Sequence, residues 1–185
     1  MINQRPLDPL ANIFNRTGEY FSEKLGKNVK LERIQPTTIQ IWTQEWSGIN
    51  QRKKPDGNFD WAKLRDTYYH KKFPYSDPRR IDIAIWEERQ LCGLAVGGIP
   101  KEKTYVSIDY IEGSPAQHPL KGRVLNIMLA VVEEYAKILK IPELRLSDPV
   151  DDLIKYYESQ YGFQTIAMDV SHPKNRRYCS KKIDS

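Results

Sequence analysis

The sequence predicts an α+β domain in three α/β/α layers, with a central mixed, mostly antiparallel sheet and helices on both of its faces. Strand-like and helix-like segments follow one another in the order β-α-α-β-β-β-α-β-α-β-β from residue 29 to residue 183. Single helices between strands are typical of a sheet that is covered on both faces. The chain has 185 residues, which suffices for one full hydrophobic core. We therefore expect a single domain over residues 29–185, preceded by a helical appendage over residues 1–28.

Periodicity and turn residues mark the elements of the first half. Apolar and polar residues alternate over 29–34, as in a half-buried strand, and Pro36 then opens a helix with apolar residues at helical spacing. A second helix is expected over 60–72. Two strands, 81–86 and 91–98, are joined by a charged turn, which predicts a hairpin. The tryptophans of the two helices, at helical spacing, are expected to pack in the core: Trp42, Trp46 and Trp61.

A long amphipathic helix is the strongest element of the second half. A strand is expected over 105–111, and the helix follows over 123–140, with an apolar inner face and Pro142 as its stop. A short strand follows over 144–147.

The C-terminal elements begin with a helix whose start and end both carry signals. Asp148 is expected to cap this helix, with Pro149 as its first residue and Gly162 at its end. The last two strands are expected over 163–168 and 177–183.

The net charge of the chain is mildly positive, at +5 with an isoelectric point near 9.1. Such charge could attract the phosphates of a cofactor, an acidic partner or nucleic acid. It is too modest and scattered to favour nucleic acid. No apolar run approaches the roughly 20 residues that a membrane span needs, so we expect no membrane association. The basic residues gather in four places: Arg52–Lys54, His70–Lys72, Arg79–Arg80 and the tail 174–182.

Cysteine and histidine usage predicts a cytoplasmic protein without a structural metal. Cys92 and Cys179 both fall in strand-like runs and are expected to be reduced core thiols, and the start of the chain lacks the pattern of a secretory signal. Three scattered histidines and two distant cysteines do not have the spacing of a zinc site.

The junction Lys121-Gly122 carries the clearest functional signal. It lies between the strand-like run 106–111 and the apolar-striped stretch 125–140. A glycine at this point lets the start of a helix approach a bulky anion, because the first turn has unpaired N–H groups and the positive end of the helix dipole. The junction therefore predicts a phosphorylated cofactor.

This junction, together with the stretch from Tyr156-Tyr157 to Gly162-Phe163, resembles the GCN5-related N-acetyltransferase (GNAT) superfamily over residues 29–183. The resemblance implies a central strand that ends in a splayed bulge, which receives the pantetheine arm of acetyl-coenzyme A. It also implies a loop of the form Arg/Gln-Gly-x-Gly-x-Gly/Ala around the pyrophosphate. Only the first glycine of that loop is retained here. The cofactor-binding residues that the resemblance implies are Ile111, Lys121, Gly122, Arg123, Val124, Leu125 and Asn126.

Val124 takes the place of a glycine, so its backbone conformation decides whether the loop can work. A β-branched residue in the left-handed conformation would cost on the order of 1–2 kcal/mol or more, whereas in a helical conformation the cost is small. We expect Val124 to lie in the first turn of the helix and to be helical. Its side chain is expected near the pyrophosphate, where Lys121 and Arg123 would offset the crowding by their charge.

Two residues are the candidates for acid–base chemistry. Tyr157 matches the tyrosine that many family members place near the cofactor sulfur, where a phenol can protonate the departing thiolate. Tyr156 beside it is expected to be core. The amine must lose a proton before it attacks, since an unperturbed lysine has a pKa of about 10.4. Glu112, at the end of the central strand, is the expected base. Asp109 is expected to face the opposite side of the same strand.

The segment 113–120 is longer than the usual family connection and contains His118. This histidine could line an acceptor pocket or belong to a solvated loop.

Three functions remain open from the sequence. The first is an acetyltransferase that transfers acetyl from acetyl-coenzyme A directly to a primary amine of a small molecule or a protein. The second is a coenzyme A-binding regulatory module without turnover, suggested by the lost glycines. The third is an acetyltransferase that acts on an RNA-borne amine, suggested by the basic clusters. The sequence does not identify the acceptor.

Overall fold

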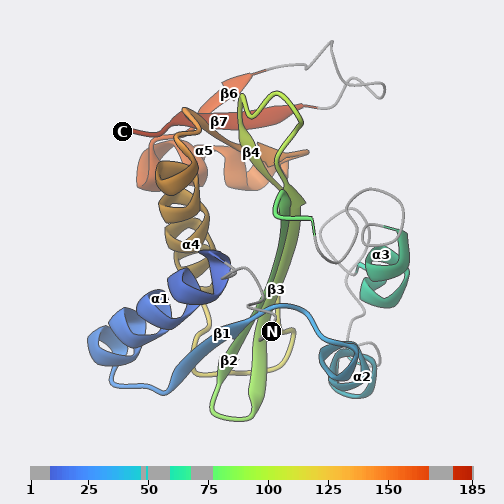
Figure 1. Ribbon diagram of the computed structural model, residues 1–185. Coiled ribbons are helices and arrows are strands. Elements are labelled where there is room, and N and C mark those ends of the chain that lie inside the picture. Colours follow the sequence, from blue (N-terminus) through green and yellow to red (C-terminus); the bar gives the residue numbers. More distant parts are fainter. Residues whose placement is uncertain (1–8, 47–48, 50–58, 68–76, 167–176, 185) are drawn as a thin grey trace, which may run out of the picture.

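The computed structural model describes residues 9–46, 49, 59–67, 77–166 and 177–184. The predicted order of strands and helices is confirmed over these residues (Figure 1). In chain order the elements are α1 (Pro9–Leu25), β1 (Val29–Glu32), α2 (Pro36–Glu45), α3 (Trp61–Thr67), β2 (Arg80–Glu87), β3 (Gln90–Gly98), β4 (Val106–Gly113), α4 (Val124–Leu139), β5 (Glu143–Ser147), α5 (Asp151–Tyr161), β6 (Gln164–Ile166) and β7 (Tyr178–Lys182).

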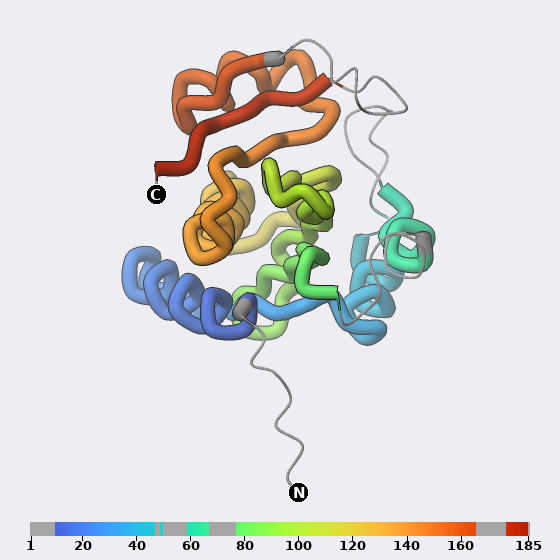
Figure 2. Tube along the Cα trace, turned by 45° about the horizontal axis from the view of Figure 1, so that its top comes forward, coloured from blue at the N-terminus to red at the C-terminus, as the bar shows by residue number. Residues whose placement is uncertain are grey.

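The described strands form one mixed sheet in the order β1-β2-β3-β4-β5-β7-β6. The neighbours β4 and β5 are parallel, whereas the other adjacent pairs are antiparallel. Helices α1 and α4 lie on one side of the sheet and α2 and α3 on the other, as both views show (Figures 1 and 2). The predicted layered α+β architecture is confirmed.

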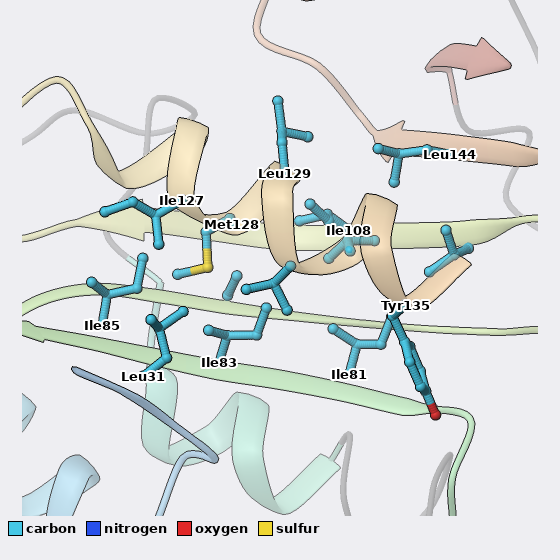
Figure 3. Packing of buried hydrophobic residues seen from close by; sticks show 14 of the residues in the cluster. Leu31, Ile81, Ile83, Ile85, Ile108, Ile127, Met128, Leu129, Tyr135 and Leu144 are labelled. Carbon is cyan, nitrogen blue, oxygen red and sulfur yellow. The ribbon is translucent and has the colours of Figure 1, made fainter. Parts of the chain in front are cut away.

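The main core lies between α4 and the sheet (Figure 3). Isoleucines from β2 and β4 face the apolar side of α4, which is the face that the helical periodicity predicted. Helix α1 packs against β1 and α4, and its buried residues belong to this same core. The boundary expected after residue 28 stays a prediction, but α1 is part of the core layer. The residues of α1 in this core are Leu10, Ile13, Phe14 and Phe21.

A second cluster, rich in tryptophan, fills the other face of the sheet. Trp42 from α2, Trp46 at the C-cap of α2, Trp61 from α3 and Trp86 from β2 are all buried there. The prediction that the helix tryptophans are core residues is confirmed.

A β-bulge in β4 decides which of these two clusters each of its residues faces. Val96 of β3 pairs with Tyr110 and Gly97 pairs with Ile108, so Asp109 is the extra residue. In a regular strand, residues 108, 110 and 112 would share one face. Here Ile108 lies in the α4-side core, whereas Tyr110 packs against the tryptophan cluster. The bulge thereby turns Glu112 towards α3, where its carboxylate meets Trp61.

The bulge depends on Gly97, because β4 passes unusually close to it. A Cβ atom on residue 97 would lie 1.9 Å from the Ser107 carbonyl oxygen. We expect Gly97→Ala to lower the free energy of unfolding by about 3 kcal/mol or more, since a backbone atom cannot move aside as a side chain can. Denaturant unfolding measures this loss. Gly113→Ala is the matched control, because its new Cβ would have nothing nearer than 3.7 Å. Equal stability of the two variants would contradict the close approach.

The start of α5 differs from the prediction. The cap is Val150, the helix begins at Asp151, and no side-chain capping bond is formed. Asp148 has a left-handed backbone with φ of 46°, and its N–H donates to the carbonyl of Arg177 at 2.8 Å. This backbone hydrogen bond joins the segment after β5 to the residue just before β7. The prediction that Asp148 caps the helix and Pro149 opens it was wrong.

Some predicted features fall outside the described residues. These are 68–72 of the second predicted helix, 167–168 of the penultimate predicted strand, and the basic clusters 52–54, 70–72 and 174–176.

Candidate active site

A cleft opens where β4 and β5 diverge. The two strands pair only from Val106–Leu144 to Ile108–Leu146, after which β4 continues to Gly113. The cleft has a volume of about 830 Å³, within the range of small-molecule sites. Residues 108–113 of β4 and Ser114 after it form one wall, and residues 146–153 together with Tyr156 and Tyr157 form another. The bulge and the splayed strands have the arrangement that the family resemblance implied.

Most of the predicted site residues meet in this cleft. Arg123 and Asn126 are the two that do not line it. The predicted residues on its walls are Ile111, Glu112, Lys121, Gly122, Val124, Leu125 and Tyr157.

The junction before α4 has a left-handed backbone at its glycine. Gly122 has φ of +77°, in the left-handed region that favours glycine. Arg123 is the N-cap residue and makes no side-chain capping bond, and the helix begins at Val124. The expectation that position 124 is helical is confirmed. Gly122, Val124 and Leu125 line the cleft beside Lys121, whereas the Arg123 N–H donates to the Leu120 carbonyl at 2.9 Å.

The Val124 side chain is accommodated by a glycine on a neighbouring strand. A Cβ on Gly93 of β3 would lie 2.6 Å from Val124 Cγ1, so the valine occupies the place of that missing side chain. Val124 is accordingly buried, and it also faces Gly113 at the end of β4. The Val124 side chain, which stands where the GNAT pattern has a glycine, is thus packed against Gly93 in the sheet.

This pairing predicts a compensating double variant. Gly93→Ala should lower the free energy of unfolding by about 1–3 kcal/mol, because the new methyl group overlaps Val124. Adding Val124→Ala should restore most of that loss, because it removes both γ carbons that the methyl group meets. A double-mutant cycle from denaturant unfolding measures the coupling. Purely additive losses would contradict the packing.

Asn126 ties α4 to α5 instead of facing the cleft. The Tyr161 hydroxyl donates to Asn126 Oδ1, and it is also within hydrogen-bond distance of the Tyr156 hydroxyl, at 3.2 Å. Burial, followed by the hydrogen bond with Tyr156, raises the pKa of Tyr161. Tyr156 itself is 42% exposed, so the expectation that it is a core residue was wrong.

Glu112 is a buried carboxylate with an indole donor. Its side chain is buried, and the Trp61 Nε1–H donates to its Oε2 at 2.6 Å. Phe59 and Tyr110 pack edge to face nearby, with their ring centroids 5.1 Å apart, and both line the cleft. Glu112 is therefore held in one orientation at the end of β4. The sequence placed Trp61 in the core but did not predict this bond; the only signal is that a buried indole N–H needs an acceptor.

Asp109 is engaged elsewhere. Ser147 Oγ on β5 donates to its Oδ1 at 2.8 Å. Leu146 lies in the α4-side core, so the next residue, Ser147, and the Asp109 carboxylate that it meets lie towards the opposite face, where Glu112 meets Trp61. The expectation that the two carboxylates face opposite sides was therefore wrong. The bulge at Asp109 is the reason, because the alternation holds only in a regular strand.

Tyr157 is a buried phenol on the opposite wall. It lies on α5, lines the cleft and packs against Phe163, with ring centroids 6.5 Å apart. Burial raises the pKa of Tyr157 to about 12, with smaller contributions from Cys179 and Tyr156. The phenol therefore keeps its proton at neutral pH and is able to donate it.

His118 lies on the cleft as a buried imidazole. It is 5% exposed, and its Nδ1 has no hydrogen-bond partner in the described part of the chain. Burial, together with the positive charge of Lys121, lowers the pKa of His118. Leaving a buried polar atom unpaired costs about 1–3 kcal/mol. The sequence left open whether His118 lines a pocket or belongs to a solvated loop. Its burial on the wall of the cleft agrees with the first of these.

Other chemistry has little support in the described residues. Over the described ranges, no three His, Cys, Asp or Glu side chains are grouped as metal ligands. Cys92 and Cys179 are both buried free thiols. Among the described helices, none combines the length and apolar character needed to cross a membrane.

Comparison with known proteins agrees with this geometry. No protein-family model matches the sequence, and a search of the curated proteins finds no match. Three solved structures illustrate the likeness in fold. The ribosomal-protein-S18-alanine N-acetyltransferase from Escherichia coli has a TM-score of 0.54 at 14% identity, over 85% of this chain and 95% of that one. The PaiA N-acetyltransferase from Thermoplasma acidophilum, in complex with coenzyme A, has a TM-score of 0.51 at 16% identity, over 83% and 98%. A protein of the GNAT family from Desulfovibrio desulfuricans has a TM-score of 0.60 at 13% identity, over 84% and 99%.

Proposed function

We propose that this chain, which has the GNAT fold, is an N-acetyltransferase that transfers acetyl from acetyl-coenzyme A directly to a primary amine. One observation carries the proposal. The cleft between the diverging strands brings a buried carboxylate, a buried phenol and the left-handed Gly122 junction to one place. An acid, a base and an anion-binding helix start are the groups that this reaction needs.

The acyl donor would bind along the walls that carry backbone donors. The backbone N–H groups of Gly122 and of the first turn of α4 would hold the pyrophosphate, and Lys121 would add positive charge. Ile111 and its neighbours on β4 would hold the pantetheine arm beyond the last β4–β5 pair. Acetyl-coenzyme A supplies a thioester whose carbonyl is open to attack by nitrogen.

Glu112 would begin the chemistry by taking a proton from the ammonium group of the acceptor, directly or through a water molecule. The neutral amine attacks the thioester carbonyl, and the C–N bond forms. The C–S bond then breaks, and the Tyr157 phenol gives its proton to the departing thiolate. The second proton of the attacking nitrogen passes to the phenolate, directly or through water, which leaves a neutral amide and restores the phenol. No covalent enzyme intermediate is needed, because both substrates are held in the same cleft.

Calorimetry with acetyl-coenzyme A tests this proposal. Binding, followed by transfer of labelled acetyl to an amine in a lysate as read by mass spectrometry, is the expected result and would also identify the acceptor. Absence of binding up to millimolar concentration would overturn both the cofactor and the activity. Binding without turnover over a broad panel of amines would instead favour a coenzyme A-binding regulatory module.

No described contact favours an RNA-borne amine. Arg177 pairs with Asp151 at 2.6 Å, and Lys181 pairs with Glu133 at 2.9 Å. These basic residues of the tail therefore have carboxylate partners. A small molecule or a protein is the proposed acceptor, and a cytoplasmic location remains a prediction.

A further inference from the structure

The side chain of His118 has no task in the reaction as described above, although it is one of the least exposed polar groups in the cleft. Its Nδ1 lacks a hydrogen-bond partner in the part of the chain that the structure describes. Polar side chains this deeply buried normally have a partner. Because His118 lines a cleft of ligand size, a bound ligand could supply the missing hydrogen-bond partner of Nδ1.

The position of His118 indicates which part of a ligand it would meet. The backbone N–H of Lys121 donates to the His118 carbonyl at 3.2 Å, so the two residues close the turn that leads directly into Gly122. Lys121, Gly122 and His118 all line the cleft. His118 therefore lies on the cleft next to the junction before α4, where the positive end of the helix dipole stabilises an anion.

The charge state of the ring fits a hydrogen-bond donor. Lys121 is the charged group that acts on the imidazole, and its effect and burial both favour the neutral ring. A neutral imidazole has one N–H donor, and a half-turn of the ring exchanges the places of Nδ1 and Cδ2. Nδ1 is itself covered in this structure, and rotation of the ring is the movement that would bring Nδ1–H to a ligand.

We propose that His118 donates a hydrogen bond from Nδ1 to a phosphate oxygen of the acyl donor bound at the Lys121-Gly122 junction. The proposal rests on the proposed function. His118 would add a side-chain donor to a loop that retains only the first of the glycines found in the family pattern. The site is specific for the phosphate-bearing arm and makes no contact with the acetyl group.

Two substitutions separate the hydrogen bond from the shape of the ring. His118→Asn places an amide near the position of Nδ1, whereas His118→Leu fills space and cannot hydrogen-bond. Calorimetry would compare both variants with the unaltered protein, using coenzyme A and pantetheine, which lacks phosphate. We expect His118→Leu to weaken coenzyme A binding by about 10- to 100-fold, the range for a hydrogen bond to a charged group. His118→Asn should stay within about threefold, and pantetheine binding should be unchanged in both.

Each other result overturns the proposal. Unchanged coenzyme A binding in His118→Leu shows that the ring makes no contact that matters. Equal weakening for coenzyme A and pantetheine places the ring on the phosphate-free arm. Failure of the unaltered protein to bind coenzyme A refutes the proposed function itself, which is a distinct outcome.

A measurement on the unaltered protein keeps the proposal testable if His118→Leu does not fold. The chain has three histidines, whose ring nitrogens are resolved by long-range ¹H–¹⁵N spectra, with His118→Asn used for assignment. We expect the His118 Nδ1 resonance to move when coenzyme A is added and to stay in place when pantetheine is added. A resonance that ignores coenzyme A, while calorimetry shows binding, overturns the proposal.

Discussion

Glu112→Gln is expected to lower kcat/KM for the acceptor amine by about 10²- to 10⁴-fold at neutral pH, with coenzyme A binding unchanged. The amide cannot accept the proton that the ammonium group must lose. It keeps the volume of the side chain and an oxygen for the Trp61 N–H, which donates to Glu112 at 2.6 Å. The fold around α3 should therefore survive. Steady-state kinetics with the identified acceptor, together with calorimetry for the donor, measures the two effects separately.

The second carboxylate on β4 provides the control for this experiment. Asp109 lines the same cleft but accepts a hydrogen bond from Ser147 on β5. Asp109→Asn keeps an acceptor for that hydroxyl, and we expect it to change kcat/KM by less than about tenfold. If Asp109→Asn proves as damaging as Glu112→Gln, the base has been misassigned. If Glu112→Gln keeps full activity over the acidic range as well, no carboxylate of β4 takes the proton.

Raising the pH offers a second check on the same assignment. The loss in Glu112→Gln should shrink as the pH approaches the pKa of the free amine, because a rising fraction of the acceptor is already neutral. A loss that stays constant from neutral to alkaline pH would indicate that Glu112 binds the acceptor instead of deprotonating it.

Local patterns predicted the fold, because hydrophobic periods and turn residues are properties of neighbouring residues. The long period-3.6 stripe of α4 and the glycine at 122 were both readable in this way. The bulge in β4 could not be predicted from local patterns, because it arises from the register between β3 and β4. It depends on how close Gly97 of β3 lets β4 approach, and the sequence shows only a glycine in a strand.

The details of the site depend on contacts between residues far apart in the chain. Trp61 reaches Glu112 from α3, and Gly93 makes room for Val124. The alternation of β4 predicted the wrong relation between Asp109 and Glu112, because one extra residue changes the face of everything after it. Trp61, Glu112 and Val124 had each been identified as a candidate or a core residue from the sequence, but Gly93 had not, and the pairing between elements could be seen only in the structure.

Tyr157→Phe is expected to lower kcat by about 10²-fold or more while leaving stability and donor binding nearly unchanged. The change removes the proton that the departing thiolate would take and keeps the ring, which packs against Phe163. Tyr156→Phe is the matched control on the same helix, because that hydroxyl is exposed and is within hydrogen-bond distance of Tyr161. We expect the control to change kcat by less than about threefold. Rapid kinetics of acetyl transfer from pre-bound acetyl-coenzyme A would compare the two.

The raised pKa of Tyr157 makes this assignment testable by pH as well. Burial raises the pKa from 10.0 to about 12, so the protonated phenol, which is the form that donates, persists through the range in which an ordinary tyrosine ionises. The folded state also binds this proton more tightly than the unfolded state, and its contribution to stability, complete below pH 10, is lost as the pH rises from 10 towards 12. Tyrosinate absorbance during titration, taken as the difference between the unaltered protein and Tyr157→Phe, should show one ionisation near 12. A difference signal centred near 10 would show a solvated phenol and would contradict the burial of Tyr157 in the wall of the cleft.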